Sequence, residues 1–209
     1  MLTDAAIIGC LADYGVRASA LQCGQIRDYI ALLLRWNRSI SLTSLTDEAE
    51  ILRFHFGESV FALSAVDALN GRLADVGTGA GFPGLPLRIF NDRRDLTLVE
   101  SNSKKCAFLN EVVRRLGLIG TDVSRTRYED LPEALGGHFD VIVSRALGGY
   151  GDLLSWAEMA LTPHGRVILW LGEDDAQKVG STAGWSWKPR ILIPKSERRY
   201  LLVGCPARE

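Results

Sequence analysis

The chain has 209 residues, of which 47% are hydrophobic, and a formal net charge of −1. This predicts one main domain with a sizeable core, and no run approaches the ~18 apolar residues of a membrane span. No signal-like segment opens the chain and its four cysteines form no Cys-x-x-Cys pair. We therefore expect no metal site, no membrane attachment and a reduced, cytoplasmic compartment.

The chain begins with segments that have helical periodicity. A short predicted helix is followed by a longer one, which Ser19 and Gln22 open with the spacing of a capping box. A third helix is predicted from near Asp47. Because all three precede the first predicted strand, we expect residues 1–70 to form an N-terminal helical cap on a core of residues 71–209.

Beyond the cap, the hydrophobic pattern alternates between strands and helices. Repeated βα units form a parallel sheet that is covered by helices on both faces. The last two strands have no helix between them and are expected to pair antiparallel at the sheet edge. We therefore predict an α/β, Rossmann-like fold with a mostly parallel, seven-stranded sheet, its strands at 72–76, 96–100, 122–126, 139–144, 165–170, 187–193 and 199–204.

A glycine-rich turn follows the first predicted strand. Gly77, Gly79 and Gly81 alternate after Asp75, and Gly84 closes the turn. Glycine is favoured where the backbone has a positive φ or lies against a ligand. Because a strand that leads through such a turn into a helix forms a nucleotide cradle at the carboxyl end of a parallel sheet, the segment predicts a nucleotide site.

Three kinds of nucleotide site compete for this turn. A P-loop requires Lys-Ser/Thr after its last glycine, but Leu85 and Pro86 stand there. A dinucleotide site requires a third glycine where this chain has Phe82. The remaining pattern, Asp-x-Gly-x-Gly-x-Gly, resembles motif I of class I S-adenosylmethionine (AdoMet) methyltransferases. Its Asp75 suits AdoMet, which carries a sulfonium and an ammonium group and no phosphate.

Glu100 ends the second predicted strand, 23 residues after Gly77. An acid about twenty residues beyond the first glycine is placed to accept hydrogen bonds from both ribose hydroxyls of a bound nucleoside. The alternative is an ordinary solvated acid at a strand end. The glycines upstream favour the ribose-binding interpretation.

Basic residues are concentrated near the end of the chain. Residues 185–199 contain one acid, Glu197, and five basic residues, which are Lys188, Arg190, Lys195, Arg198 and Arg199. Such a face is able to neutralise the phosphates of a nucleic acid. It is equally typical of an edge hairpin that charge protects from further pairing.

Motifs spread over nearly the whole chain resemble one family, RsmG (also called GidB), the 16S ribosomal RNA guanine-N7 methyltransferases. The most specific are the Phe-Pro-Gly-x-Pro tail of motif I and the Ser144-Arg145-Ala146 that ends the fourth predicted strand. Further motifs of the resemblance are Trp36-Asn37-Arg38, Leu42-Thr43, Asp47, His55, Arg127-Tyr-Glu-Asp-Leu131 and Glu197-Arg198.

The resemblance implies roles for individual residues. Gly77 and Phe82 would lie along AdoMet, Tyr128 and Glu129 would border its adenine, and Arg145 would reach into the cofactor and target pocket. On spacing alone, Tyr128 and Glu129 fit a loop aromatic and a solvated acid equally well. Arg145 could be a surface charge, but its place at the carboxyl end of a central strand favours the ligand crevice.

The chain departs from the family's pattern near the expected RNA-facing mouth. The family usually has Asn where Ser41 stands, Arg where Phe54 stands, Asp where Glu58 stands and Lys where Leu171 stands. Two basic groups are therefore missing, and each lost phosphate contact weakens binding to RNA.

The resemblance implies transfer of a methyl group from AdoMet to N7 of a guanine in 16S rRNA or in the small ribosomal subunit. We expect the protein to be a monomer. N7 is a neutral acceptor that loses no proton, so no general base is required and positioning supplies most of the rate. The Asn/Asp-Pro-Pro-aromatic loop of adenine-amine methyltransferases is missing, as is a cysteine nucleophile near the end of the fourth strand. Two alternatives stay open: a methyltransferase of small molecules or other RNA, and an AdoMet-binding RNA-interaction protein with little turnover.

Overall fold

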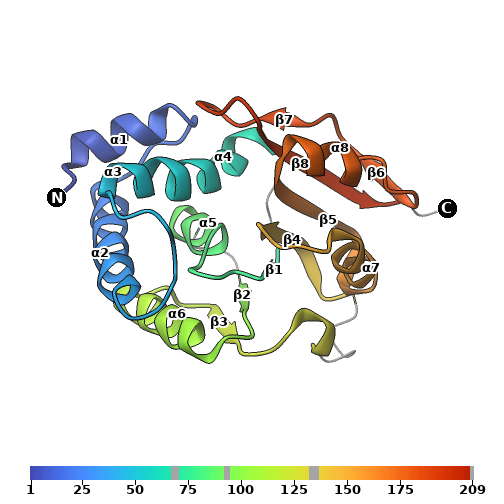
Figure 1. The fold of residues 1–209 in the computed structure, drawn as a ribbon, viewed down its shortest axis with the longest axis horizontal. Coiled ribbons are helices and arrows are strands. Elements are labelled where there is room, and N and C mark those ends of the chain that lie inside the picture. Colours follow the sequence, from blue (N-terminus) through green and yellow to red (C-terminus); the bar gives the residue numbers. More distant parts are fainter. Residues whose placement is uncertain (67–70, 92–94, 132–136, 208–209) are drawn as a thin grey trace.

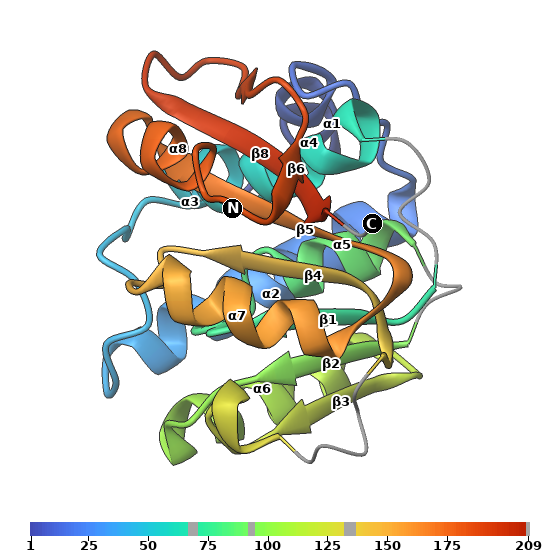
Figure 2. The same ribbon diagram turned by 90° about the vertical axis from the view of Figure 1, so that its right-hand side faces the viewer.

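The computed structural model describes residues 1–66, 71–91, 95–131 and 137–207. Its centre is an eight-stranded sheet in the order β3-β2-β1-β4-β5-β8-β6, with β7 paired to β8 (Figure 1). The first five strands are parallel to their neighbours, and β8 is antiparallel to β5. Figure 2 shows this order from β3 at the bottom to β8 at the top. The strands are β1 Leu73–Val76, β2 Leu96–Val99, β3 Thr121–Ser124, β4 Phe139–Arg145, β5 Leu161–Gly172, β6 Trp185–Trp187, β7 Ile191–Leu192 and β8 Arg199–Pro206.

The α/β, Rossmann-like sheet is confirmed, but the expected count of seven strands is wrong for the described residues. In place of the one strand predicted over 187–193, the structure has β6, which ends at Trp187, and β7 at Ile191–Leu192, and the two pair with different parts of β8. Pro189 lies in the gap between them. Because proline has no N–H to donate, it interrupts a ladder at this point.

The helices are α1 Asp4–Ala12, α2 Ala20–Asn37, α3 Glu48–Ile51, α4 Glu58–Ala65, α5 Gly84–Phe90, α6 Ser103–Leu116, α7 Tyr150–Ala160 and α8 Glu173–Val179. The capping box is confirmed, since Ser19 and Gln22 bond to each other's backbone N–H groups. Two features were not expected. A π-helical segment, Leu52–Gly57, joins α3 to α4, and α8 follows β5 directly.

Side chains alternate between the two faces of the sheet, as the period of a strand requires. Val141, Val143 and Ile168 face the core that contains the N-terminal helices, α5 and α6. Ile142 and Leu169, one position away, face the core under α7 and α8. Helices therefore cover both faces of the sheet.

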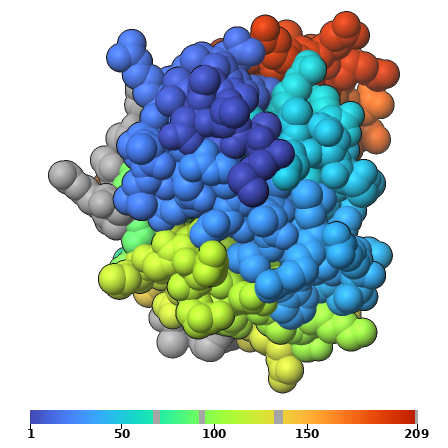
Figure 3. Space-filling model, turned by 90° about the vertical axis from the view of Figure 1, so that its left-hand side faces the viewer, coloured from blue at the N-terminus to red at the C-terminus, as the bar shows by residue number. Residues whose placement is uncertain are grey.

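The N-terminal helices share a continuous apolar core with the sheet. Ile7, Ile26 and Phe56 are fully buried in the same cluster as Leu98 of β2. Figure 3 shows the N-terminal segment, in blue, covering much of one face beside the yellow-green segment that contains α6. The boundary expected at residue 70 falls on residues 67–70, which lie outside the described residues.

Candidate active site

The turn after β1 has the backbone that its glycines predict. Gly77, Gly79 and Gly81 have φ values of 67°, 59° and 91°. These values lie in the region that L side chains rarely adopt. The turn then enters α5 at Gly84, so a strand, a glycine turn and a helix follow one another at the carboxyl edge of the sheet.

Asp75 lies beneath this turn rather than beside a cavity. Its side chain is fully buried, and Oδ2 accepts hydrogen bonds from Thr78 Oγ1 at 2.6 Å and from the Gly84 N–H at 2.7 Å. Burial raises the pKa of the carboxyl to about 6, although these two hydrogen bonds oppose the shift. This placement differs from the expected one, because Asp75 holds the two ends of the turn together instead of facing a ligand.

Tyr29 of α2 supports the turn from the side of the helical cap. Its hydroxyl donates to the Ala80 carbonyl, and its ring stacks on Phe82 with a centroid distance of 5.2 Å. A Cβ on Gly81 would lie 2.3 Å from the Tyr29 hydroxyl, so glycine is required there by space as well as by φ. Phe82, which was expected to lie along the cofactor, is instead 5% exposed and packed between Tyr29 and His55.

A cavity of about 510 Å³, here called the loop pocket, lies beside the turn. Gly77 and Gly79 line it from the turn, Glu100 from the end of β2, and Tyr128 and Glu129 from the short helix after β3. Five of the residues predicted from the sequence therefore meet around one cavity. Asp75, Gly81, Phe82 and Arg145 are outside its lining.

The loop pocket suits a ligand with positive charge and hydroxyl groups. Glu100 accepts the Gly79 N–H at 3.1 Å through Oε2 and the Asn102 N–H at 2.8 Å through Oε1. Each carboxylate oxygen has a further lone pair, so both remain able to accept from a hydroxyl. Three acids line the pocket against two cationic side chains, the acids being Glu100, Glu129 and Asp152 and the cations Lys105 and Arg127.

A second cavity, of about 530 Å³ and here called the strand-end pocket, adjoins the first. It lies at the carboxyl ends of β4 and β5, between the π-helical segment and β8. Ala146, the residue after β4, lines both pockets. Ala146 has a φ of 57°, which is uncommon for a residue with a Cβ, and residues with such strained backbone are enriched at functional sites.

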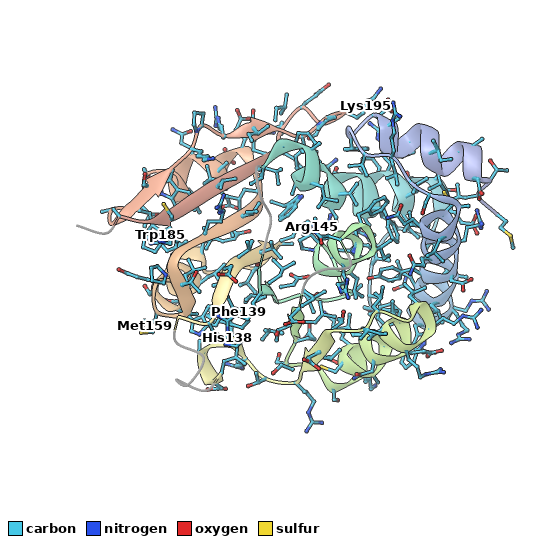
Figure 4. The ribbon with its side chains drawn as sticks, turned by 180° about the vertical axis from the view of Figure 1, so that it is seen from behind. His138, Phe139, Arg145, Met159, Trp185 and Lys195 are labelled. Atoms are coloured by element: carbon cyan, nitrogen blue, oxygen red, sulfur yellow. The ribbon has the colours of Figure 1, made fainter. Side chains whose placement is uncertain are left out.

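Arg145 connects β4 to the π-helical segment within the strand-end pocket. Its Nη1 donates to the Phe54 carbonyl at 3.0 Å, and its Nη2 lies 2.9 Å from His55 Nδ1. The Nε2 atom of His55 lies 2.7 Å from Thr43 Oγ1. Because Arg145 is a donor only, Nδ1 of His55 must accept, so the ring is neutral and carries its hydrogen on Nε2. Figure 4 shows Arg145 near the centre of the molecule, far from Trp185 on the outer strand.

His55 predicts a loss of stability in acid. Burial, together with the nearby Arg145, lowers its pKa from 6.5 to about 3. The unfolded chain binds a proton at His55 below about pH 6.5 while the folded protein does not, so acid favours the unfolded state. We expect the stability of the wild type, relative to that of His55→Gln, to fall as the pH is lowered from about 7.5 to about 4. Urea unfolding of both proteins measures this difference, and a difference independent of pH would contradict it.

Sequence reasoning assigned no role to several residues of this site. Asn37 Oδ1 accepts the backbone N–H groups of Leu42 and Thr43, at 2.9 and 3.0 Å, and so shapes the loop that carries Thr43 to His55. Asn37 and Thr43 belong to motifs of the family resemblance, and those motifs were the only feature of the sequence that could have indicated a role for them. No motif pointed to Tyr29, or to Trp170, which lines the strand-end pocket and donates from Nε1 to the Glu58 carbonyl at 2.7 Å, because their partners are distant in sequence.

A model of the family described as rRNA small subunit methyltransferase G matches residues 22–183. The chain belongs to this family. A ribosomal RNA small subunit methyltransferase G of Xylella fastidiosa is 40% identical over 84% of this chain and 83% of its own length. That of Geobacter sp. strain M21 is 34% identical over 80% of this chain and 77% of its own length.

A solved structure of a SAM-dependent methyltransferase from Aquifex aeolicus shares the fold, with a TM-score of 0.61 and 16% identity over 74% of this chain and 92% of that one. Within the described residues, no helix has the length and apolarity that crossing a membrane demands. Those same residues contain no cluster of three or more His, Cys, Asp or Glu side chains placed to hold a metal ion.

Three of the four positions at which the chain departs from the family pattern line the strand-end pocket, namely Phe54, Glu58 and Leu171. Phe54 and Leu171 are the two that lack a basic side chain. Cationic side chains nevertheless lie beside Phe54. The guanidinium carbons of Arg53 and Arg199 are 4.9 and 5.1 Å from the centre of the Phe54 ring. Arg199 also forms an ion pair of 2.6 Å with Glu58. Positive charge therefore reaches the pocket from a neighbouring position and from the last strand.

Proposed function

We propose that this protein is an AdoMet-dependent methyltransferase that methylates N7 of a guanine in the 16S rRNA of the small ribosomal subunit. The observation that carries the proposal is the junction of the two pockets at Ala146. A methyl transfer requires a donor site and an acceptor site that meet at one point. Membership of the rRNA small subunit methyltransferase G family supports the choice of substrate.

The residues around the loop pocket fit AdoMet. The glycine turn presents backbone without side chains, Glu100 has lone pairs free for ribose hydroxyls, and the excess of acids suits a ligand with a sulfonium and an ammonium group. Tyr128 and Glu129 would border the adenine. When bound, AdoMet supplies an electrophilic methyl group.

The strand-end pocket fits an acceptor that needs no deprotonation. His55 stays neutral at physiological pH and both of its ring nitrogens are engaged, by Arg145 and Thr43, so it is poorly placed to act as a base. Guanine N7 requires only that its lone pair be held in line with the methyl group and that water be excluded. We assign Arg145 the role of a positioning residue, because it fixes the π-helical segment against the end of β4.

The RNA would approach across the strand-end pocket. Arg53 and Arg199, which flank the Phe54 ring of this pocket, would neutralise phosphates near its mouth. We propose that the protein acts as a cytoplasmic monomer. The absence of basic side chains at Phe54 and Leu171 favours one alternative, a small methyl acceptor in the same pocket.

Methyl transfer distinguishes these substrates. We expect tritium from labelled AdoMet to enter the 16S rRNA of small ribosomal subunits taken from cells that lack this protein, and to be located on a guanine by mass mapping. Naked 16S rRNA and GMP serve as competing acceptors, and small subunits from cells that contain the protein serve as the control. Label that enters only GMP or another small acceptor would replace the rRNA proposal with the alternative.

A further inference from the structure

We propose that Glu58 recognises the Watson–Crick edge of the target guanine, accepting hydrogen bonds from its N1–H and its 2-amino group. This inference rests on the proposed function and assigns the residue that selects the base. Glu58 is the first residue of α4, directly after the π-helical segment. Its side chain lines the strand-end pocket, although the residue is only 4% exposed.

The Glu58 carboxylate is oriented and partly unpaired. Oε1 forms the 2.6 Å ion pair with Arg199 of β8. The described residues show no hydrogen bond to Oε2, and the carboxylate lines the strand-end pocket. Burial raises the pKa of this carboxyl, while Arg199 and Arg145 oppose the shift and favour the ionised form that accepts hydrogen bonds. A desolvated carboxylate of this kind has capacity for a ligand with two donors.

Arg145 supplies the complementary donors on the same pocket. Two of its N–H groups are engaged, one by the Phe54 carbonyl and one by His55. A guanidinium has five N–H groups, so three remain. Glu58 and Arg145 both line the pocket, so its lining holds an acceptor and a donor, which is the combination that the N1–H and O6 of guanine require.

The order of these groups also fits the reacting atom. Around the guanine ring, the 2-amino group, N1–H, O6 and N7 follow one another. If Glu58 takes the first two and Arg145 takes O6, then N7 lies on the far side of Arg145 from Glu58. The next residue, Ala146, is the one that lines both pockets. The same arrangement therefore turns N7 towards the loop pocket.

Adenine is disfavoured by the same two residues. It has an amino group where guanine has O6, so donor would meet donor at Arg145, and it has no N1–H for Glu58. A site that leaves a buried polar group unpaired discriminates strongly against the wrong ligand. Asp175, the other carboxylate of the pocket, is exposed, so water competes for its hydrogen bonds and its selectivity would be weaker.

Nucleotide binding tests this assignment without methyl transfer. The affinities of GMP, inosine monophosphate and AMP are measured by NMR titration of the wild type and of Glu58→Gln. Inosine monophosphate differs from GMP only in lacking the 2-amino group. In the wild type, we expect GMP to bind about tenfold more tightly than inosine monophosphate, and AMP to bind more weakly still. In Glu58→Gln the difference between GMP and inosine monophosphate should nearly vanish, because one amide oxygen cannot serve both donors while the amide N–H opposes N1–H.

Glu50→Gln is the matched control. It makes the same change of charge at an exposed position in the first turn of α3, outside both pockets, and should retain the wild-type ranking. Thermal melting checks that both variants are folded. The inference is overturned if the wild type binds no GMP, if it binds GMP no better than the other two nucleotides, or if Glu58→Gln keeps the ranking. Methyl transfer to small subunits, measured in parallel, distinguishes failure of this inference from failure of the proposed function. If the wild type transfers methyl groups but does not prefer GMP, only the role of Glu58 is removed. If it transfers none, the proposed function itself is removed.

Discussion

Asp75→Ala is expected to abolish AdoMet binding, with an affinity at least about 100-fold below that of the wild type. The reason is indirect, because the carboxylate is buried beneath the glycine turn and binds both Thr78 Oγ1 and the Gly84 N–H. Without it, the buried Gly84 N–H has no acceptor and the turn loses the group that joins its two ends. Leaving such a donor unpaired costs about 1–3 kcal/mol of unfolding free energy.

Calorimetric titration with AdoMet and urea unfolding together measure both effects of this substitution. Asp75→Asn is the matched control, because its amide oxygen is still able to accept the Gly84 N–H while the charge is lost. We expect Asp75→Asn to be more stable than Asp75→Ala and to keep part of the affinity. If Asp75→Ala binds AdoMet as tightly as the wild type, the glycine turn is not the cofactor site or does not depend on this carboxylate.

The roles of Asp75 and Glu100 show what sequence could and could not establish. The spacing of both acids relative to the glycines indicated a nucleoside site, and Glu100 does line the loop pocket. The pattern does not distinguish an acid that faces a ligand from one that holds the turn. That distinction depends on the Gly84 N–H, which reaches Asp75 only because the turn folds back over the end of β1.

The parallel sheet was predictable because βα periodicity is a local property of the chain. The π-helical segment was not, since residues 48–65 have the pattern of an ordinary helix. A long-range contact accompanies this segment: Tyr14 donates to the Arg53 carbonyl at 3.2 Å, and a Cβ on Gly57 would lie 2.3 Å from the Tyr14 ring. Likewise, the pairing of Glu58 with Arg199 joins residues 141 positions apart (199 − 58). The acceptor side of the site therefore depends on tertiary contacts that the sequence pattern does not show, although Thr43, His55 and Arg145 themselves belong to motifs of the family resemblance.

Arg145→Ala is expected to lower kcat/KM for methyl transfer to small subunits by about 100-fold or more, since even small misplacement of a bound reactant costs this much. Arg145 lines the strand-end pocket and not the loop pocket, so AdoMet affinity should change far less.

The pKa of His55 provides an independent readout of the same substitution. Arg145 contributes to the low pKa of His55, and its removal should raise that pKa, which NMR titration of the imidazole measures. Arg115→Ala, which removes an exposed cation paired with Asp28, is the control for charge alone and should leave transfer unchanged.

Arg145→Lys separates charge from geometry. Lysine keeps the positive charge, but its single ammonium cannot reproduce the planar fork by which Arg145 holds the Phe54 carbonyl and His55 Nδ1 together. If Arg145 acts by positioning, Arg145→Lys should recover little of the lost transfer, although it is folded and binds AdoMet. Recovery of most of the activity would mean that a positive charge at the end of β4 is sufficient. Unchanged transfer in Arg145→Ala would make Arg145 a structural residue, and the acceptor site would then have to be sought outside the strand-end pocket.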